Sequence, residues 1–349
     1  MSRIAAVATA LPEHVHPQAE ITEEIAGLLT SDPRRLALLR RVHASAGVRT
    51  RHLALPLEKY AAVQSFTEAN DLFLREGLEL AERAVRDALD AAGLRPADVD
   101  HLVFTTVTGV HAPSLDALVA QRLGMRPDLR RWPGFGLGCV GGAAGLARVD
   151  DLLAGHPDHV AVLLCVELCS LTLQHGDDST ANLVASGLFG DGVAAAVVVG
   201  DGHGAGPGPD LVGTHRALYP GTADALGWSV GSSGLRIVLS GGMADVVAQH
   251  VGDDVAALLA PLGATVPDVD AWVAHPGGPR ILDAVGDALG LPDHALATSR
   301  ASLAAAGNLS SAAVLHVLAA TDAAPGDLGV LLAFGPGVTA ELVALRWGS

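Results

Sequence analysis

The chain has 349 residues, of which 50% are hydrophobic, and a formal net charge of −16. This length can bury a large core and exceeds the usual size of one domain, so we expect two domains or one fused double unit. The strong negative charge, with Lys59 as the one lysine, disfavours nucleic acids and anionic membrane surfaces as partners.

Cysteine usage and the N-terminal residues indicate the compartment. Three cysteines are too few for a disulfide framework, and the opening MSRIAAVATALP lacks the charged region, apolar core and cleavage site of a signal peptide. The longest apolar runs, such as Val193–Val199, have the length of a strand and not of a membrane span. A cytoplasmic protein without stable membrane association is therefore expected.

The first half of the chain alternates strand and helix patterns, which is typical of a parallel α/β sheet. The clearest helix covers 66–92, with apolar residues three and four apart and Gly93 as its stop. A glycine- and proline-rich stretch, 200–210, marks the joint between an N-terminal unit, 1–203, and a C-terminal unit, 204–349. The strands expected before this joint are 4–10, a run from 101 that breaks at Gly109, 161–168 and 193–199.

The second half repeats the order of the first. In both halves a helix rich in small residues follows a strand–helix–strand segment and precedes the last two strands. The fold expected from this order is α/β, built from two pseudo-duplicated halves. The elements expected in the second half are strands 211–218, 271–275, 328–334 and 339–347 and helices 243–262 and 280–289, with the small-residue helix following Asn308.

Cys139 lies in a tight glycine turn, GFGLGCVGG, just before a helix that we expect to end near Ala154. Unpaired amides in the first turn of a helix lower the pKa of a thiol, and the thiolate is the reactive nucleophile. The alternative is a small buried cysteine at a close contact between helices. If the two halves are related by a pseudo-twofold axis, Asn308 heads the matching helix and faces Cys139, and His275, at the end of a strand, reaches the same crevice.

Five motifs resemble the type III polyketide synthases, the chalcone synthase-like enzymes of the thiolase superfamily. They are the glycine turn around Cys139, LFGDG at 188–192, HPGGPRIL at 275–282, GNLSS at 307–311 and AFGPG at 333–337. The resemblance covers essentially the whole chain. It implies a layered αβαβα thiolase-like fold and a homodimer, in which His111, Ala112 and Pro113 contact the partner.

The resemblance also implies a catalytic set of Cys139, His275 and Asn308. The cysteine accepts an acyl group from a thioester, and the imidazole and amide stabilise the enolate formed when malonyl-CoA loses carbon dioxide. Neither a metal nor a redox cofactor is expected. A structural imidazole is the alternative for His275, and a helix N-cap is the alternative or additional role for Asn308.

Other positions match the family's substrate-binding residues. Phe189 resembles the phenylalanine between the CoA tunnel and the cavity, with a core aromatic as the alternative. Arg41 matches a CoA-contacting arginine, and Arg280, directly after HPGGP, is a second candidate for the CoA phosphates. A solvated helix face is the alternative for the arginines of 34–51. The residues expected to line the cavity are Thr108, Cys169, Thr172, Trp228, Leu235, Ile237 and Ser310.

These motifs determine the family more closely than they determine which starter and product the enzyme uses. SAGVRTRHLALPLEKY and ELCSLTLQ look closest to bacterial alkylpyrone and alkylresorcinol synthases, so a fatty acyl-CoA starter extended with malonyl-CoA is expected. The aliphatic Leu235 and Ile237 favour such a starter, whereas the indole of Trp228 favours a short starter or malonyl-CoA alone. Further alternatives are an aromatic starter, one condensation as in ketoacyl synthase III, and a non-catalytic partner subunit.

Overall fold

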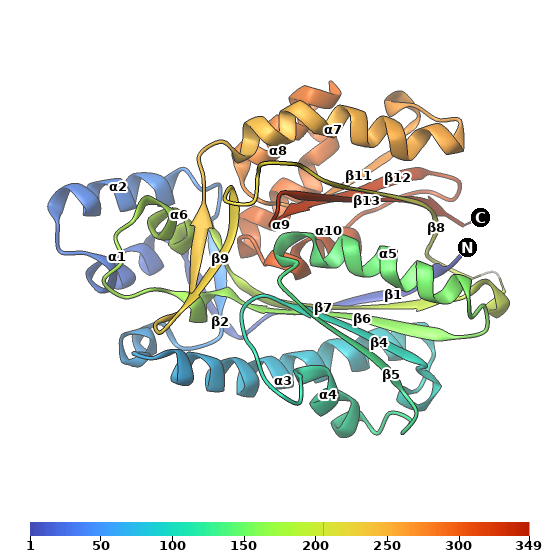
Figure 1. Ribbon diagram of the computed structural model, residues 1–349, viewed down its shortest axis with the longest axis horizontal. Helices are drawn as coiled ribbons and strands as arrows, with labels where there is room; N and C mark the ends of the chain where they lie inside the picture. The colour runs from blue at the N-terminus through green and yellow to red at the C-terminus, as the bar shows by residue number, and fades with distance from the viewer. Residues whose placement is uncertain (205, 349) are drawn as a thin grey trace.

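The computed structural model describes residues 1–204 and 206–348 and has five alternating layers (Figure 1). Ala205, inside the predicted joint, and Ser349 lie outside the described residues. Nine strands from both halves form one mixed sheet in the order β11-β12-β13-β8-β1-β7-β6-β4-β5, and β2–β3 and β9–β10 form two separate two-stranded sheets. The halves join at β1 and β8, which pair antiparallel through Arg3 and Asp210. This arrangement is the layered thiolase-like fold expected from the sequence.

Three hydrophobic cores separate the layers. The first lies between the N-terminal strands and α3 and α4, the second encloses the central helices α5 and α10, and the third lies between the C-terminal strands and α7, α8 and α9. The strands are β1 Arg3–Ala10, β2 His14–Pro17, β3 Thr50–Leu53, β4 His101–Thr106, β5 Arg130–Phe135, β6 Val160–Leu168, β7 Asp191–Val199, β8 Pro209–Leu218, β9 Leu226–Gly231, β10 Gly234–Leu239, β11 Ala271–Ala274, β12 Leu328–Gly335 and β13 Thr339–Trp347. The α-helices are α1 Gln18–Leu29, α2 Pro33–Ala44, α3 Phe66–Ala92, α4 Leu115–Leu123, α5 Gly141–Ala154, α6 Thr180–Leu188, α7 Met243–Leu259, α8 Pro279–Leu289, α9 Ala297–Ala306 and α10 Ala313–Ala319.

Local sequence explains the best-predicted helix. Ser65 and Glu68 form a capping box at the start of α3, and Gly93 ends the helix with a left-handed φ of 67°. Its buried side chains repeat at helical spacing and face the first core. None of the helices between residues 1 and 204 or between 206 and 348 has the length and apolar character needed to cross a bilayer.

The central helices begin in close contact with each other. A Cβ atom at Gly142, in the first turn of α5, would lie 2.5 Å from the backbone oxygen of Ser311, and one at Gly141 would lie 2.7 Å from Ser311 Cβ. Only glycine permits this approach. It brings the segment that carries Cys139 against the segment that follows Asn308.

Substituting Gly142 by alanine is expected to destabilise the protein by about 1–3 kcal/mol, because the added methyl group overlaps the backbone of the facing segment. Gly252→Ala in α7 is the matched control, since a Cβ there meets nothing within 4 Å. That control is expected to gain up to about 1 kcal/mol from helix propensity. Urea unfolding measures both variants, and equal shifts would contradict the close contact.

Candidate active site

Cys139 lies in a 3-10 turn, Gly138–Val140, directly before α5. Gly138 has a φ of 55°, and a Cβ there would lie 2.8 Å from Pro336 of the AFGPG loop. The glycine therefore permits both the backbone conformation and the contact with the second half. The thiol side chain is 8% exposed and lines a cavity of about 420 Å³.

Asn308 is held with its amide nitrogen toward the sulfur. Its Oδ1 accepts a hydrogen bond of 2.8 Å from the backbone N–H of Ser310, which closes a local turn. Asn308 is not the N-cap considered from the sequence, because Leu309 and Ala312 hold the N-cap positions of the two helical segments that follow. Its Nδ2 lies 4.0 Å from Cys139 Sγ and 3.5 Å from the backbone oxygen of Gly277. The donor is thus aimed at the space above the thiol.

His275 follows β11, and its backbone N–H donates to the oxygen of Leu332 over 2.8 Å. The imidazole is 4% exposed, lines the same cavity as Cys139 and Asn308, and finds no hydrogen-bond partner for Nδ1 or Nε2 among residues 1–204 and 206–348. Buried polar atoms are normally paired, so an unpaired imidazole at a cavity wall is suited to bind a polar group of a ligand. The predicted trio therefore shares one cavity.

Burial keeps these groups uncharged. It lowers the pKa of His275 to about 3, and burial together with the Glu167 carboxylate raises the pKa of Cys139 to about 12. This reverses the expectation of a thiol pKa lowered by the helix N-terminus. Hydrogen bonds from Ser310 and Asn308 act in the expected direction, but the loss of hydration outweighs them.

The sequence reasoning missed Glu167, which is fully buried at the end of β6. Its carboxylate accepts hydrogen bonds from Ser311 Oγ at 2.5 Å, Thr108 Oγ1 at 2.8 Å and the backbone N–H of Val107 at 3.1 Å. Burial still raises its pKa to about 7. A lone acidic residue within an apolar strand was the available clue.

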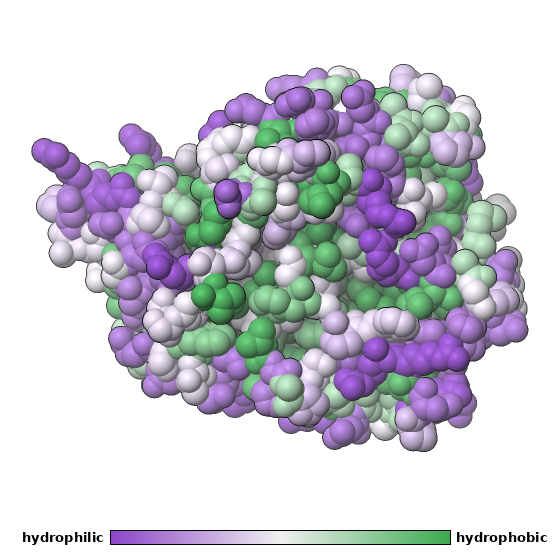
Figure 2. Space-filling model, in the orientation of Figure 1, coloured by the Kyte–Doolittle hydropathy of each residue, from purple (hydrophilic) through white to green (hydrophobic). Residues whose placement is uncertain are grey.

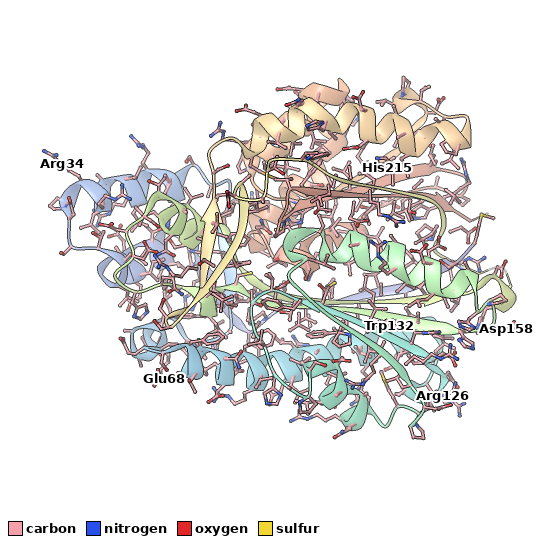
Figure 3. All side chains as sticks on the ribbon, in the orientation of Figure 1. Arg34, Glu68, Arg126, Trp132, Asp158 and His215 are labelled. Carbon is pink, nitrogen blue, oxygen red and sulfur yellow. The ribbon has the colours of Figure 1, made fainter. Side chains whose placement is uncertain are left out.

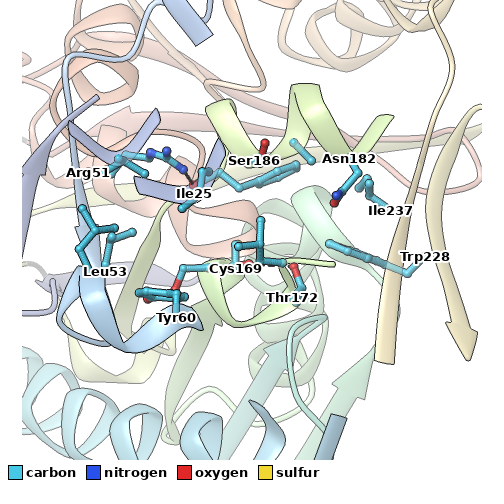
Figure 4. A pocket seen from close by; sticks show the side chains of 16 residues that line it. Ile25, Arg51, Leu53, Tyr60, Cys169, Thr172, Asn182, Ser186, Trp228 and Ile237 are labelled. Atoms are coloured by element: carbon cyan, nitrogen blue, oxygen red, sulfur yellow. Dashed lines mark hydrogen bonds between the residues drawn. The ribbon is translucent and has the colours of Figure 1, made fainter. Parts of the chain in front are cut away.

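Three predicted cavity residues divide the space beyond the thiol. Phe189, Trp228 and Ile237 line a space of about 10 Å³ beside Cys139. The same three side chains also line a pocket of about 40 Å³, which Figure 4 shows. The rings of Phe189 and Trp228 are tilted, with centroids 6.5 Å apart. Ser310, with a φ of 47°, joins them beside Cys139.

The other predicted substrate residues are distributed over several cavities. Cys169 and Thr172 line the pocket of about 40 Å³. Thr108 and Leu235 line a separate cavity of about 260 Å³, and Thr172 borders it as well. Arg280 lines the large cavity that reaches Cys139. Arg41 is exposed in the last turn of α2, next to the lining residue Val42, so its contact with CoA stays a prediction.

Comparison with known proteins identifies the family. Residues 1–203 match the family model of the N-terminal domain of chalcone and stilbene synthases, and 210–347 match that of the C-terminal domain. The chain belongs to the chalcone and stilbene synthase family. It is a type III polyketide synthase, an acyltransferase-type condensing enzyme, as its five motifs predict.

Relatives within this family include several bacterial enzymes. A 1,3,6,8-tetrahydroxynaphthalene synthase from Streptomyces peucetius subsp. caesius is 57% identical over 99% of this chain and 93% of its own length. The crystal structure of the synthase of that name from Streptomyces coelicolor has a TM-score of 0.92 and 32% identity, with 99% of each chain covered. An α-pyrone synthesis polyketide synthase-like protein of Mycobacterium tuberculosis is 30% identical over 97% of this chain and 89% of its own length.

Glu167→Gln is expected to change how stability depends on pH. The carboxyl pKa is about 7 in the folded protein against 4.5 as the ordinary value, so folding takes up a proton between these pH values. The free energy of unfolding therefore falls as pH rises through this window, by about 2–3 kcal/mol from this group. The free energy of unfolding of the wild type minus that of Glu167→Gln should decrease by that amount between pH 5 and pH 8. A difference independent of pH would contradict the shifted pKa.

Proposed function

We propose that this synthase uses malonyl-CoA as both starter and extender and forms a tetrahydroxynaphthalene-type product on Cys139. The identity of 57% with a 1,3,6,8-tetrahydroxynaphthalene synthase, over 99% of this chain, carries the proposal. The product named for the relative with 57% identity has a skeleton made of two-carbon units without an alkyl chain. The proposal replaces the fatty acyl starter and the alkylpyrone or alkylresorcinol product expected from the sequence.

The space beside Cys139 argues against a long starter. Apart from the large cavity that the thiol lines, only about 10 Å³ is open on the side of Trp228 and Ile237, roughly the room that one water molecule needs. Trp228 and Ile237 close it, and the pocket beyond them opens by only about 40 Å³. An alkyl chain would have to displace the indole of Trp228. A malonyl or acetyl unit is short enough to remain in the cavity of about 420 Å³ that Arg280 also lines.

The chemistry follows from the neutral state of the trio. Cys139 sulfur attacks the thioester carbonyl of the starter, its proton passes to the His275 imidazole, and CoA leaves as the thiol by taking that proton. A second malonyl-CoA loses carbon dioxide, and the electron pair of the broken bond forms an enolate. His275 and Asn308 donate to its oxygen, and the enolate carbon then attacks the Cys139 thioester and releases the sulfur.

Substituting either donor is expected to slow decarboxylation rather than binding. His275→Ala and Asn308→Ala should each reduce malonyl-CoA decarboxylation about a hundred- to thousandfold, because each removes a preorganised donor to the enolate oxygen. Asn308→Asp is the matched variant that keeps the shape but replaces the N–H donor. Weaker malonyl-CoA binding with normal decarboxylation would contradict these roles.

Starter choice is expected to depend on Trp228. Trp228→Ala should join the two small spaces and allow acyl-CoA starters with longer chains, with efficiency rising about three- to fourfold for each added buried methylene. Val230→Ala, on the same hairpin but 66% exposed and outside both small spaces, is the control. Competition between malonyl-CoA alone and an acetyl-to-palmitoyl series measures the preference. If the wild-type enzyme prefers long chains, the malonyl starter is wrong while the family assignment stands.

We also propose the homodimer expected from the sequence. The edge strand β5 and its surroundings expose Val110, Trp132, Phe135 and Leu137 at 42%, 51%, 49% and 38%. Figure 2 shows apolar side chains over the middle of the face that carries β5. An unpaired edge with exposed apolar side chains is suited to pairing with a second chain, and His111–Pro113 lie exposed beside it. Sedimentation should give the mass of a dimer at micromolar concentration, and a monomer would contradict this proposal.

A further inference from the structure

Three histidines gather at the end of the molecule away from the β9–β10 hairpin. His101 begins β4, and His156 and His159 lie in the turn between α5 and β6. One ring nitrogen from each lies within 4.8 Å of the other two. Asp158, in the same turn, marks this end of the molecule in Figure 3.

The spacing of the ring nitrogens is compatible with metal ligands. His101 Nε2 lies 3.0 Å from His159 Nδ1, and the rings of His156 and His159 stack with centroids 4.5 Å apart. Two nitrogens bound tetrahedrally to one Zn²⁺ are about 3.4 Å apart, so small rotations of the rings would suffice.

Backbone hydrogen bonds fix the segments that carry the three rings. The N–H of His159 donates to the oxygen of His156 over 3.0 Å, which closes the turn. Asp100 and Val160 exchange two hydrogen bonds, from Asp100 N–H at 2.8 Å and to Asp100 Oδ2 at 2.9 Å. The position before β4 is thereby tied to the start of β6, so the cluster does not depend on a loose loop.

His101 is the buried member of the cluster, with 1% exposure. Its Nε2 faces His159, and its Nδ1 has no hydrogen-bond partner in the described part of the chain. His156 and His159 are half-buried, so an ion can reach the cluster from solvent.

Two charged groups border the cluster with opposite effects on a cation. Arg130 Nη1 donates to His156 Nε2 over 3.0 Å, so the guanidinium bonds a nitrogen that a metal ion would use. This arginine is exposed and can rotate away. The Asp100 carboxylate, on the residue before His101, attracts a cation, although it is also paired with Arg126.

We propose that His101, His156 and His159 form a binding site for a divalent transition-metal ion of the kind that imidazole prefers, with Zn²⁺ as its representative and water as the remaining ligand. The ion would clip the α5–β6 turn to the start of β4. The site lies one strand length, about 20 Å, from the catalytic end of β4. It is independent of the proposed starter and product.

Equilibrium dialysis of chelator-treated protein against Zn²⁺, with the metal counted by atomic emission, tests the site. Wild-type protein should hold one more Zn²⁺ per chain than the double variant His156→Gln/His159→Gln. Both proteins keep Cys139, so binding to its thiol cancels in the comparison. Losing two ligands should weaken this binding by more than the roughly 10–100-fold typical of a lost outer-shell partner. His203→Gln, a nearby histidine outside the cluster, is the control and should bind as the wild type does.

Two further measurements separate metal binding from effects on folding. Zn²⁺ should raise the melting temperature of the wild type and not that of the double variant, while both have the same far-UV spectrum. Arg130→Gln should tighten binding by roughly fivefold, because it removes a like charge beside the ion. Equal zinc content in the wild type and the double variant at all concentrations would overturn the proposal.

Discussion

The geometry of the active site depends on the contact between the first turn of α5 and the segment before α10. Cys139 and Asn308 are separated by 169 positions in the chain, yet the sulfur and the amide nitrogen lie 4.0 Å apart. So short a distance requires the two backbones to approach without a side chain between them, which Gly141 and Gly142 permit. The pseudo-duplicated fold provides both helices, and the glycines determine how near their first turns come.

Burial of polar groups is the second constraint, and the site resolves it in two ways. Glu167 receives hydrogen bonds from Ser311, Thr108 and the backbone of Val107, so it is held as part of the scaffold under the cavity. His275 receives none among the residues that the structure describes, although it is nearly as buried. A substrate oxygen that accepts from this imidazole would supply the missing partner, and such an interaction strengthens as negative charge develops. Glu167, whose carboxylate is hydrogen-bonded within the protein, therefore supports the site. His275, which has no such partner among the described residues, is available to bind the substrate.

The sequence predicted the features that depend on local pattern. The caps at Ser65 and Gly93 determine α3, and the order of strands and small-residue helices predicted that Cys139, His275 and Asn308 would meet in one cavity. It missed β5, where two arginines, Trp132 and Pro133 break any strand pattern, because an exposed edge strand needs no alternation. The thiol pKa and the small space beside Trp228 depend on how side chains far apart in the sequence pack together, so the sequence could not predict them.

The proposed synthase starts from malonyl-CoA and carries the growing chain on Cys139. Incubation with labelled malonyl-CoA as the sole acyl donor, followed by intact mass of the protein and mass of the released product, tests this most directly. We predict an acyl adduct on the wild type that Cys139→Ala lacks, together with a product whose carbons all carry malonyl label. An adduct that persists in Cys139→Ala, or no product until another acyl-CoA is added, would contradict it.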